Sequence, residues 1–181
     1  DGTCEAHGVE GIEDGTPLVF KHTTTAATLR MDAQVLAQDI LAESCIGLEL
    51  ITVEPTLMLA TLDAGGAQRS GDSDIYHFAV IGIRTSISGP NYWACEGITT
   101  PENPAGLNLS HFCWPEIDEL FTTIASEPDE AIRQDASNQI QKFMAEQLFW
   151  IPMWDRPSLI VASSQIEGMK LVPDDISPYR G

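Results

Sequence analysis

Two cysteines and one histidine are the side chains of this chain whose spacing could support covalent chemistry. Cys95 and Cys113 enclose the segment CEGITTPENPAGLNLSHFC, and His111 lies two residues before the second cysteine. A cysteine that an imidazole deprotonates is the nucleophile of thiol-dependent hydrolases. Alternatively, the two sulfurs form a disulfide that closes the loop. Residues two apart in a loop need not point in the same direction, so both interpretations stay open at this point.

The other cysteines and acids do not indicate a metal site. None of the four cysteines belongs to a CxxC pair, which leaves the chain without the usual zinc signature. Asp72 and Asp74, in GDSD, could hold a cation, but a turn with solvated carboxylates explains them more simply. We therefore expect neither a metal nor a cofactor. An even cysteine count suggests an oxidising compartment.

The composition indicates one soluble domain without affinity for nucleic acid. The chain has 181 residues, 43% of them hydrophobic, which suffices for one core, so we expect a single domain over residues 1–181. Its 9 Lys and Arg against 27 Asp and Glu give a charge of -18, which repels nucleic acid and anionic lipid. No apolar run approaches the roughly 20 residues of a membrane span. The start, DGTCEAHGVE, lacks Met and the regions of a signal peptide, so we expect a piece of a longer protein.

The first half of the chain reads as a βαβ unit. Residues 16–25 form an apolar, β-branched strand that ends in a threonine cluster, and residues 46–54 form the next strand. Between them, residues 27–44 predict a helix whose apolar positions share one face, which we expect to pack on the sheet: Leu29, Ala33, Leu36 and Ile40. Strands joined by a crossover helix are parallel.

The second half predicts one more buried strand and two helices. Residues 71–83 are apolar almost continuously at their end, which favours a central strand, and residues 84–112 form a long connection. Helices at 115–125 and 129–148 should cover the sheet, the second capped by Asp129 with Ile132, Ala136, Ile140 and Phe143 on one face. Closing strands are expected at 149–154 and 158–163.

Several strings in this order resemble a known family. They are AQVLAQDI, IGLELITVE, GDSDIYHFAVIG, NLSHFCWPEIDEL, IQKFMAEQLFWIPMW and IEGMKL. Together they resemble the C-terminal lobe of family 5 extracellular solute-binding proteins, the oligopeptide- and dipeptide-binding type of ABC importers. The resemblance implies a mixed, partly parallel α/β sheet flanked by helices, as one lobe of a two-lobed type II periplasmic-binding-protein fold. It implies a solute held between the lobes and no enzymatic activity.

The resemblance also implies partners and a location. The partners would be the N-terminal lobe of the same protein, an ABC transporter permease, and a peptide or small-molecule solute. The location would be extracytoplasmic, either periplasmic or anchored at the outer face of the cell membrane. Solutes in open α/β sheets bind beyond the carboxyl ends of the strands.

The chain departs from the dipeptide-binding members of this family. Those resemble one another in an Arg after the first strand, for the peptide carboxylate, and an Asp after GW in the third-strand loop, for the amine. In this chain Thr23, Thr24 and Thr25 lie near the position of that Arg. In the segment GIRTSISGP, Ile83 occupies the position of the Trp, and Ser86 or Ser88 that of the Asp. Burying a charge without a counter-charge is costly. We therefore expect an oligopeptide or a neutral polar solute rather than a dipeptide.

The candidate ligand-binding residues follow from this comparison. Arg84 could clamp a carboxylate, Trp93 or Trp154 could form an apolar wall, and Asn108 either faces solute or caps the next helix. Trp150 is expected in the core. The full set is Thr23, Thr24, Thr25, Ile83, Arg84, Thr85, Ser86, Ser88, Asn91, Trp93, Asn108 and Trp154.

Relatives of this type resemble the chain in a cysteine pair across the same loop, which favours a Cys95–Cys113 disulfide. Such a staple contributes about 3 kcal/mol by loop-closure entropy. The βαβ interpretation brings Cys4 and Cys45 to one end of the sheet, so we expect a second disulfide there. A thiol-dependent hydrolase using Cys113 and His111 remains the alternative function.

Overall fold

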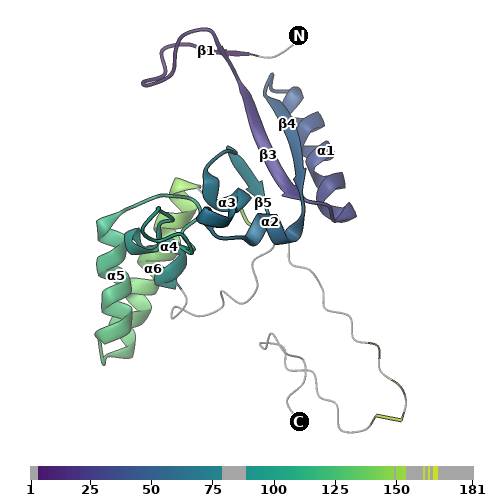
Figure 1. Ribbon diagram of the computed structural model, residues 1–181. Coiled ribbons are helices and arrows are strands. Elements are labelled where there is room, and N and C mark those ends of the chain that lie inside the picture. Colours follow the sequence, from purple (N-terminus) through teal and green to yellow (C-terminus); the bar gives the residue numbers. More distant parts are fainter. Residues whose placement is uncertain are drawn as a thin grey trace.

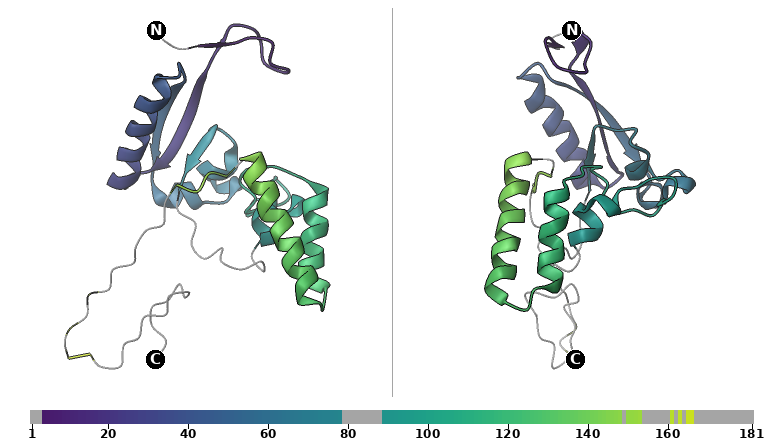
Figure 2. Two further views of the ribbon diagram at one scale, coloured as in Figure 1. Left: turned by 180° about the vertical axis from the view of Figure 1, so that it is seen from behind. Right: turned by 90° about the vertical axis from the view of Figure 1, so that its left-hand side faces the viewer.

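The structure is a computed structural model that describes residues 4–78, 89–148, 150–153, 161, 163 and 165–166. A strand and helix layer at the amino-terminal end and a helical part toward the carboxyl end are joined by short helices (Figures 1 and 2). None of the helices that the structure describes combines the length and apolar character needed to span a membrane.

The sheet confirms the predicted parallel pairing of the first two strands. Its strands are β3 (Val19–Thr25), β4 (Gly47–Val53) and β5 (Ile75–His77). Both β4 and β5 pair with β3 in parallel, in the order β4-β3-β5. Among the described strands, β3 is therefore central, and its second half is buried, with His22 to Thr25 at most 5% exposed. The central position predicted for the third strand rested on its apolar end, and residues 79–83 of that end lie outside the described part of the chain.

Helix α1 (Thr28–Ala42) packs on the sheet through polar side chains. Gln34 Nε2 donates to the carbonyl oxygens of His22 (2.6 Å) and Ile51 (3.3 Å), and Gln38 Nε2 donates to that of Leu48 (2.7 Å). These bonds turn the glutamines toward the strands and the predicted apolar face away. That prediction was wrong: the exposed fractions are 51% for Leu29, 60% for Leu36 and 55% for Ile40.

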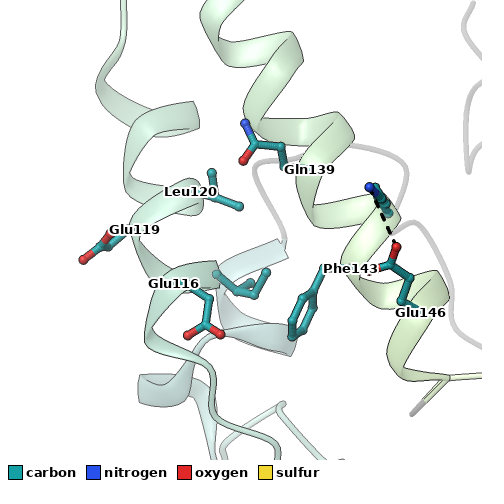
Figure 3. Close-up of a pocket in the computed structure, with 8 residues that line it drawn as sticks. Glu116, Glu119, Leu120, Gln139, Phe143 and Glu146 are labelled. Carbon is teal, nitrogen blue, oxygen red and sulfur yellow. Dashed lines mark ion pairs between the residues drawn. The ribbon is translucent and has the colours of Figure 1, made fainter.

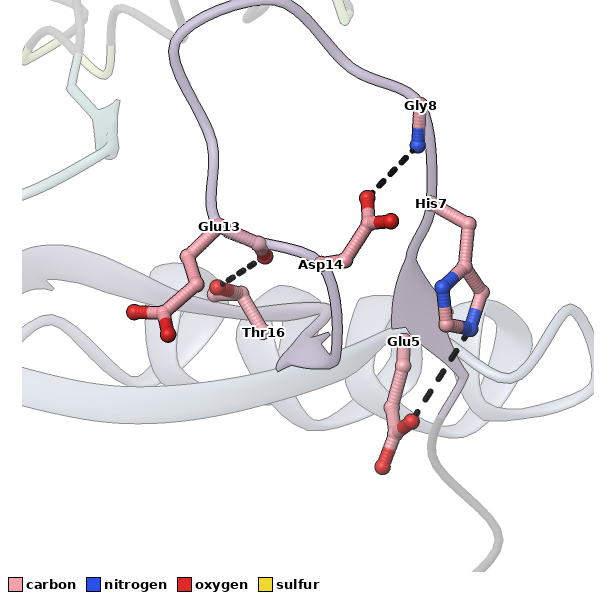
Figure 4. Close-up of polar contacts among 6 residues, drawn as sticks. All are labelled: Glu5, His7, Gly8, Glu13, Asp14 and Thr16. Carbon is pink, nitrogen blue, oxygen red and sulfur yellow. Dashed lines mark hydrogen bonds and ion pairs between the residues drawn. The ribbon is translucent and has the colours of Figure 1, made fainter.

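A small antiparallel hairpin precedes the sheet. It consists of β1 (Glu5–Ala6) and β2 (Thr16–Pro17). Its loop is held by the Gly8 amide, which donates to Asp14 Oδ1 (2.8 Å), and by the Thr16 hydroxyl, which donates to the Glu13 carbonyl (2.6 Å; Figure 4). These contacts satisfy polar groups of the loop within the hairpin itself.

The structure corrects the predicted Cys4–Cys45 disulfide, since both residues are free thiols. The two residues do meet, as the βαβ geometry requires: the Cys4 amide donates to the Cys45 carbonyl at 2.8 Å. A hydrogen bond with the Cys45 side chain, aided by burial, raises the pKa of the Cys4 thiol. Cys45 has a φ of 59°, the left-handed conformation that turns the chain between α1 and β4.

The joint between the two parts is built around a buried guanidinium. The joint comprises α2 (Pro55–Leu59), a 3₁₀ turn (Leu62–Ala64) and α3 (Ala67–Ser70). Arg69, only 7% exposed, donates from Nε to the carbonyl of Gly106 (3.0 Å) and from Nη1 to those of Leu59 and Ala60 (2.7 Å each). One side chain thereby connects the joint to the loop that follows α4.

The helical part forms its own small core. Its helices are α4 (Gly89–Trp93), α5 (Pro115–Ser126) and α6 (Glu130–Gln147). As predicted, Pro115 opens α5, and the Asp129 carboxylate caps α6 by accepting from the Ala131 amide at 2.8 Å. The buried core comprises Ala94, Ile117, Phe121 and Ile140.

The expectation that α5 and α6 cover the sheet was wrong. They pack against each other and α4, beside the sheet rather than over it (Figures 1 and 2). The apolar side chains of α5 meet Ala94 and Ile140 instead of the strands. On α6, Ala136 and Ile140 are buried as predicted, whereas Ile132 is 48% exposed.

The predicted closing strands lie mostly outside the described residues. Within them, residues 150–153 form no strand. Trp150, predicted as core, is 39% exposed and packs edge-on against Trp93, with 5.1 Å between ring centroids.

Replacing Arg69 by Met should lower the free energy of unfolding by about 2 to 4 kcal/mol, because three carbonyl oxygens lose a charged donor. Denaturant unfolding followed by circular dichroism measures the change. The matched control is Lys142→Met, which removes a cation whose side chain is 78% exposed and should cost at most about 0.5 kcal/mol. Equal, small effects of both substitutions would contradict the role of Arg69.

Candidate functional site

The threonine cluster at the carboxyl end of β3 is buried rather than open. The exposed fractions are 2% for Thr23 and 0% for Thr24 and Thr25. The Thr23 hydroxyl is hydrogen-bonded to that of Ser73, and the Thr24 hydroxyl donates to the His77 carbonyl at 2.6 Å. Thr25 Oγ1 accepts from the Arg30 guanidinium. In the part of the chain that the structure describes, these hydroxyls bind neighbouring elements and so fix the shape of this edge.

Arg30 supplies the positive charge at this edge, and sequence reasoning missed it. Its guanidinium carbon lies 4.6 Å from the centroid of the Phe78 ring, a cation–π contact. Arg84, the residue predicted as the charge clamp, lies outside the described residues. The position of Arg30 in the first turn of the helix after a threonine-rich strand was the signal that could have identified it.

A second missed feature is a pair of stacked imidazoles on adjoining strands. The rings of His22 and His77 have centroids 5.9 Å apart and planes inclined by 28°. Burial, followed by the influence of His77, lowers the pKa of His22. Burial, followed by the charge of Arg30, lowers the pKa of His77. Both side chains are therefore held toward their neutral forms.

The loop after α4 is closed by the predicted Cys95–Cys113 disulfide, which joins residues 18 positions apart. The Asp118 carboxylate, in the first turn of α5, accepts from the Cys95 amide at 3.1 and 3.3 Å. Asn108 is 0% exposed, and its side-chain amide donates to the carbonyls of Ala94 (3.0 Å) and Phe112 (2.9 Å). Asn108 therefore braces the loop from inside, and its predicted contact with solute stays untested.

A small pocket of about 230 Å³ opens beside this loop and includes the exposed side chain of Asn91. Two glycines shape it by close backbone packing. A Cβ on Gly97 would lie 2.4 Å from the Asn91 carbonyl oxygen, and one on Gly106 would lie 2.6 Å from the Gly97 carbonyl oxygen. Any larger residue at either position must displace the backbone. The lining residues are Asn91, Glu96, Gly97, Asn103, Ala105, Gly106 and Leu107.

The predicted ligand-binding residues fall into two described groups. Thr23–Thr25 lie on the sheet, and Asn91, Trp93 and Asn108 surround the disulfide-closed loop. Trp93 is half-buried and packs on the helical core. The remaining predicted residues lie outside the described part of the chain: Ile83, Arg84, Thr85, Ser86, Ser88 and Trp154.

A larger groove of about 470 Å³ runs between α5 and α6 and has an acidic rim (Figure 3). Ile117, Leu120 and Phe143 contribute its apolar lining. The rim carries Glu116, Glu119, Gln139 and the ion pair of Lys142 with Glu146, whose charged atoms are 3.8 Å apart. The edges of the groove are open and carry charged side chains, as is usual for a helix surface exposed to solvent.

The residues proposed for metal or thiol chemistry have structural roles. The Asp74 carboxylate accepts from the Lys21 amide at 2.7 Å, where β5 joins β3. Among the described residues, no cluster of three His, Cys, Asp or Glu side chains could hold a metal ion. Cys113 is bonded to Cys95, so the hydrolase alternative has no thiolate in this form.

Comparison with known proteins identifies the fold. No protein-family model and no curated protein matches the chain. Among solved structures, an oligopeptide-binding protein from Thermus thermophilus complexed with a pentapeptide matches with a TM-score of 0.65 and 19% identity, over 82% of this chain and 25% of that chain. AppA, an oligopeptide-binding protein from Bacillus subtilis in complex with a nonapeptide, matches with a TM-score of 0.58 and 18% identity, over 82% of this chain and 28% of that chain.

A third match widens the range of solutes among proteins of this fold. NikA from Brucella suis, in complex with Fe(III)-EDTA, has a TM-score of 0.54 and 19% identity, over 80% of this chain and 28% of that chain. The chain thus spans about a quarter of the length of the solved structures that it matches. It has the fold of one part of a two-lobed ABC-transporter substrate-binding protein, as the resemblance implied.

Two of the four cysteines should react with a thiol reagent in denaturant without reductant, and all four after reduction, because only Cys95 and Cys113 are bonded. Peptide mapping should find these two linked. Replacing both by Ser should lower the free energy of unfolding by about 3 kcal/mol through the longer unfolded loop. The matched control, Cys4→Ser with Cys45→Ser, should cost much less. Four reactive thiols in the unreduced protein would contradict the disulfide.

Proposed function

We propose that this chain is one lobe of an extracytoplasmic solute-binding receptor that serves an ABC importer. The single observation that carries the proposal is the likeness of most of the chain to one part of oligopeptide-binding proteins. Its partners would be the N-terminal lobe of the same protein, the transporter permease and a solute. Closure of the two lobes over the solute would be a hinge motion stabilised by contacts to both.

The rigid edge of this lobe supports such a role. Ligand contacts select a closed state only if the groups that make them keep their positions. The Thr23–Thr25 segment is bonded to β5 and α1, and the loop beside Asn91 is braced by a disulfide and Asn108. The buried threonines would thus hold the edge of the sheet in place, and the braced loop would hold Asn91 in position for a solute.

The solute would be an oligopeptide or a neutral polar molecule. The small pocket offers the Asn91 amide, which can donate and accept hydrogen bonds, and carries Glu96 as its ionisable lining residue. A peptide backbone likewise offers both hydrogen-bond donors and hydrogen-bond acceptors. The loop residues Thr85, Ser86 and Ser88 add hydroxyls in this proposal, with Ile83, Trp93 and Trp154 as apolar contacts and Arg30 or Arg84 as the site for a single carboxylate.

A role in binding rather than catalysis is favoured by the same observations. The matched proteins are binding proteins, and the cysteine of the hydrolase alternative is in a disulfide. His111, its would-be partner, is exposed and has a φ of 57°. A nucleophile without a free sulfur cannot form a thioester intermediate.

Mass spectrometry of small molecules that co-purify with the full-length protein should find a peptide of more than two residues or an uncharged polar solute. Extracts of the denatured protein are compared with those of a protein of similar size from the same preparation. A charged dipeptide, enriched in proportion to the protein, would contradict the inference from the missing Arg and Asp.

Asn91→Ala in the full-length protein should weaken solute binding about fivefold to tenfold, because one hydrogen bond to an exposed amide contributes about 1 kcal/mol. Isothermal titration with the identified solute measures the effect. Asn138→Ala, an exposed position on α6, is the matched control and should leave the affinity unchanged. Equal affinities of the two variants would remove Asn91 from the site.

A further inference from the structure

The stacked histidines lie on the same face of the sheet, beside the edge assigned to the solute. The parallel register pairs His22 with Ile75 and Thr24 with His77, so both imidazoles project from one side. The Thr24 hydroxyl donates to the His77 carbonyl, which ties the pair directly to the threonine cluster. A change in the charge of either ring therefore acts on the edge of the sheet.

The surroundings of His22 suit a neutral ring and oppose a charged one. The residue is 5% exposed, and its Nδ1 is the one buried side-chain polar atom without a hydrogen-bond partner among the described residues. A neutral imidazole can leave this nitrogen without a proton, whereas the imidazolium must carry a proton on both nitrogens. Protonation would create a buried donor with no acceptor, in addition to a buried charge.

Among the described residues, the group that acts on the His22 ring brings no negative charge. It is His77, whose imidazole is cationic when protonated. Helix α2 contributes no ionisable side chain. The other ionisable groups on the described elements that pack around β3 are exposed or engaged elsewhere: Lys21 on β3, Glu49 on β4, Asp32 and Asp39 on α1, Asp74 just before β5, and Tyr76 on β5.

We propose that the stacked His22–His77 pair makes this edge of the sheet acid-sensitive, so that protonation of His22 weakens the β3–β5 pairing and lowers the affinity for solute. This regulation rests on the proposed function. The proton comes from the solvent. The charged His22 ring then lies buried against the His77 ring, with a donor at Nδ1 that has no acceptor among the described residues. Within the described residues β5 meets β3 over three residue pairs, so loss of the Thr24–His77 bond would remove a large part of the described contact.

The direction of the pH effect follows from the sign of the shifts. Both histidines have folded-state pKa values lowered from the ordinary 6.5, so below about pH 6.5 the unfolded chain binds more protons than the folded one. Stability is therefore complete above that pH and is lost as the pH falls from 6.5 toward the lowered values. The His22→Phe substitution keeps an aromatic ring but removes the contribution of His22 to this dependence.

Thermal unfolding of the full-length protein without solute, at pH 7.5 and pH 5.0, tests the stack itself. We expect the midpoint to fall on acidification by about 5 °C more in the wild type than in His22→Phe or His77→Phe. The matched control is His7→Phe, because His7 has a side chain that is 68% exposed. That control should retain the full pH response. If His22→Phe does not fold, His77→Phe and the titration of the imidazole protons by NMR give the same comparison.

Solute affinity over the same pH range tests the regulation. The affinity of the wild type should fall about tenfold between pH 7.5 and pH 5.0, and that of His77→Phe should fall much less. Equal pH responses of the wild type and both variants would overturn the proposal, as would a solute affinity that ignores pH while stability does not. An acid-labile stack in a protein that binds no peptide or neutral solute at any pH would instead overturn the proposed function.

Discussion

The structure depends on one constraint: a strand rich in polar side chains is buried at the centre of the sheet, so every one of its polar groups needs a partner. The backbone of β3 bonds to β4 and β5. Its threonine hydroxyls find Ser73, the His77 carbonyl and Arg30, and Gln34 of α1 reaches the carbonyl of His22. Because an unpaired buried polar group costs about 1 to 3 kcal/mol, these partners determine how α1 and β5 sit on β3. Nδ1 of His22 is the exception: it has no partner among the described residues, and a neutral imidazole can leave this nitrogen without a proton.

The same principle connects the sheet to the helical part. Arg69 fills the joint and donates to carbonyls of two separate segments, while Asn108 and Asp118 satisfy amides and carbonyls around the disulfide. These polar side chains pair with backbone groups at places where no regular helix or strand ladder exists. The apolar core of the helical part is small, so the shape of the loop beside Asn91 rests on directed polar bonds as much as on packing.

Sequence reasoning predicted the elements well and their faces poorly. Apolar periodicity and caps located β3, α1, β4, α5 and α6, and the cap at Asp129 was correct. The face of α1 was wrong because periodicity assumes that apolar residues point inward, whereas Gln34 and Gln38 hold the inner face. The site was harder still: the family pattern pointed to Thr23–Thr25, but the stacking of His22 on His77 joins residues far apart in the sequence and leaves no local pattern. The Cys95–Cys113 disulfide was predictable because the long loop and the family resemblance both indicated it. For Cys4 and Cys45 only their proximity was predicted, and two thiols that lie close together need not form a disulfide.

The outward-facing stripe of α1 has a consequence for handling the chain by itself. Leu29, Leu36 and Ile40 together form an apolar strip on the surface of a molecule whose charge is -18. Repulsion between the negatively charged molecules then opposes their association through this apolar strip. Salt weakens that repulsion, since the Debye length falls to about 3 Å at 1 M, and acid near the isoelectric point of 4.2 removes it. Concentrated solutions of the chain should therefore stay clear at low ionic strength and turn turbid when salted or acidified.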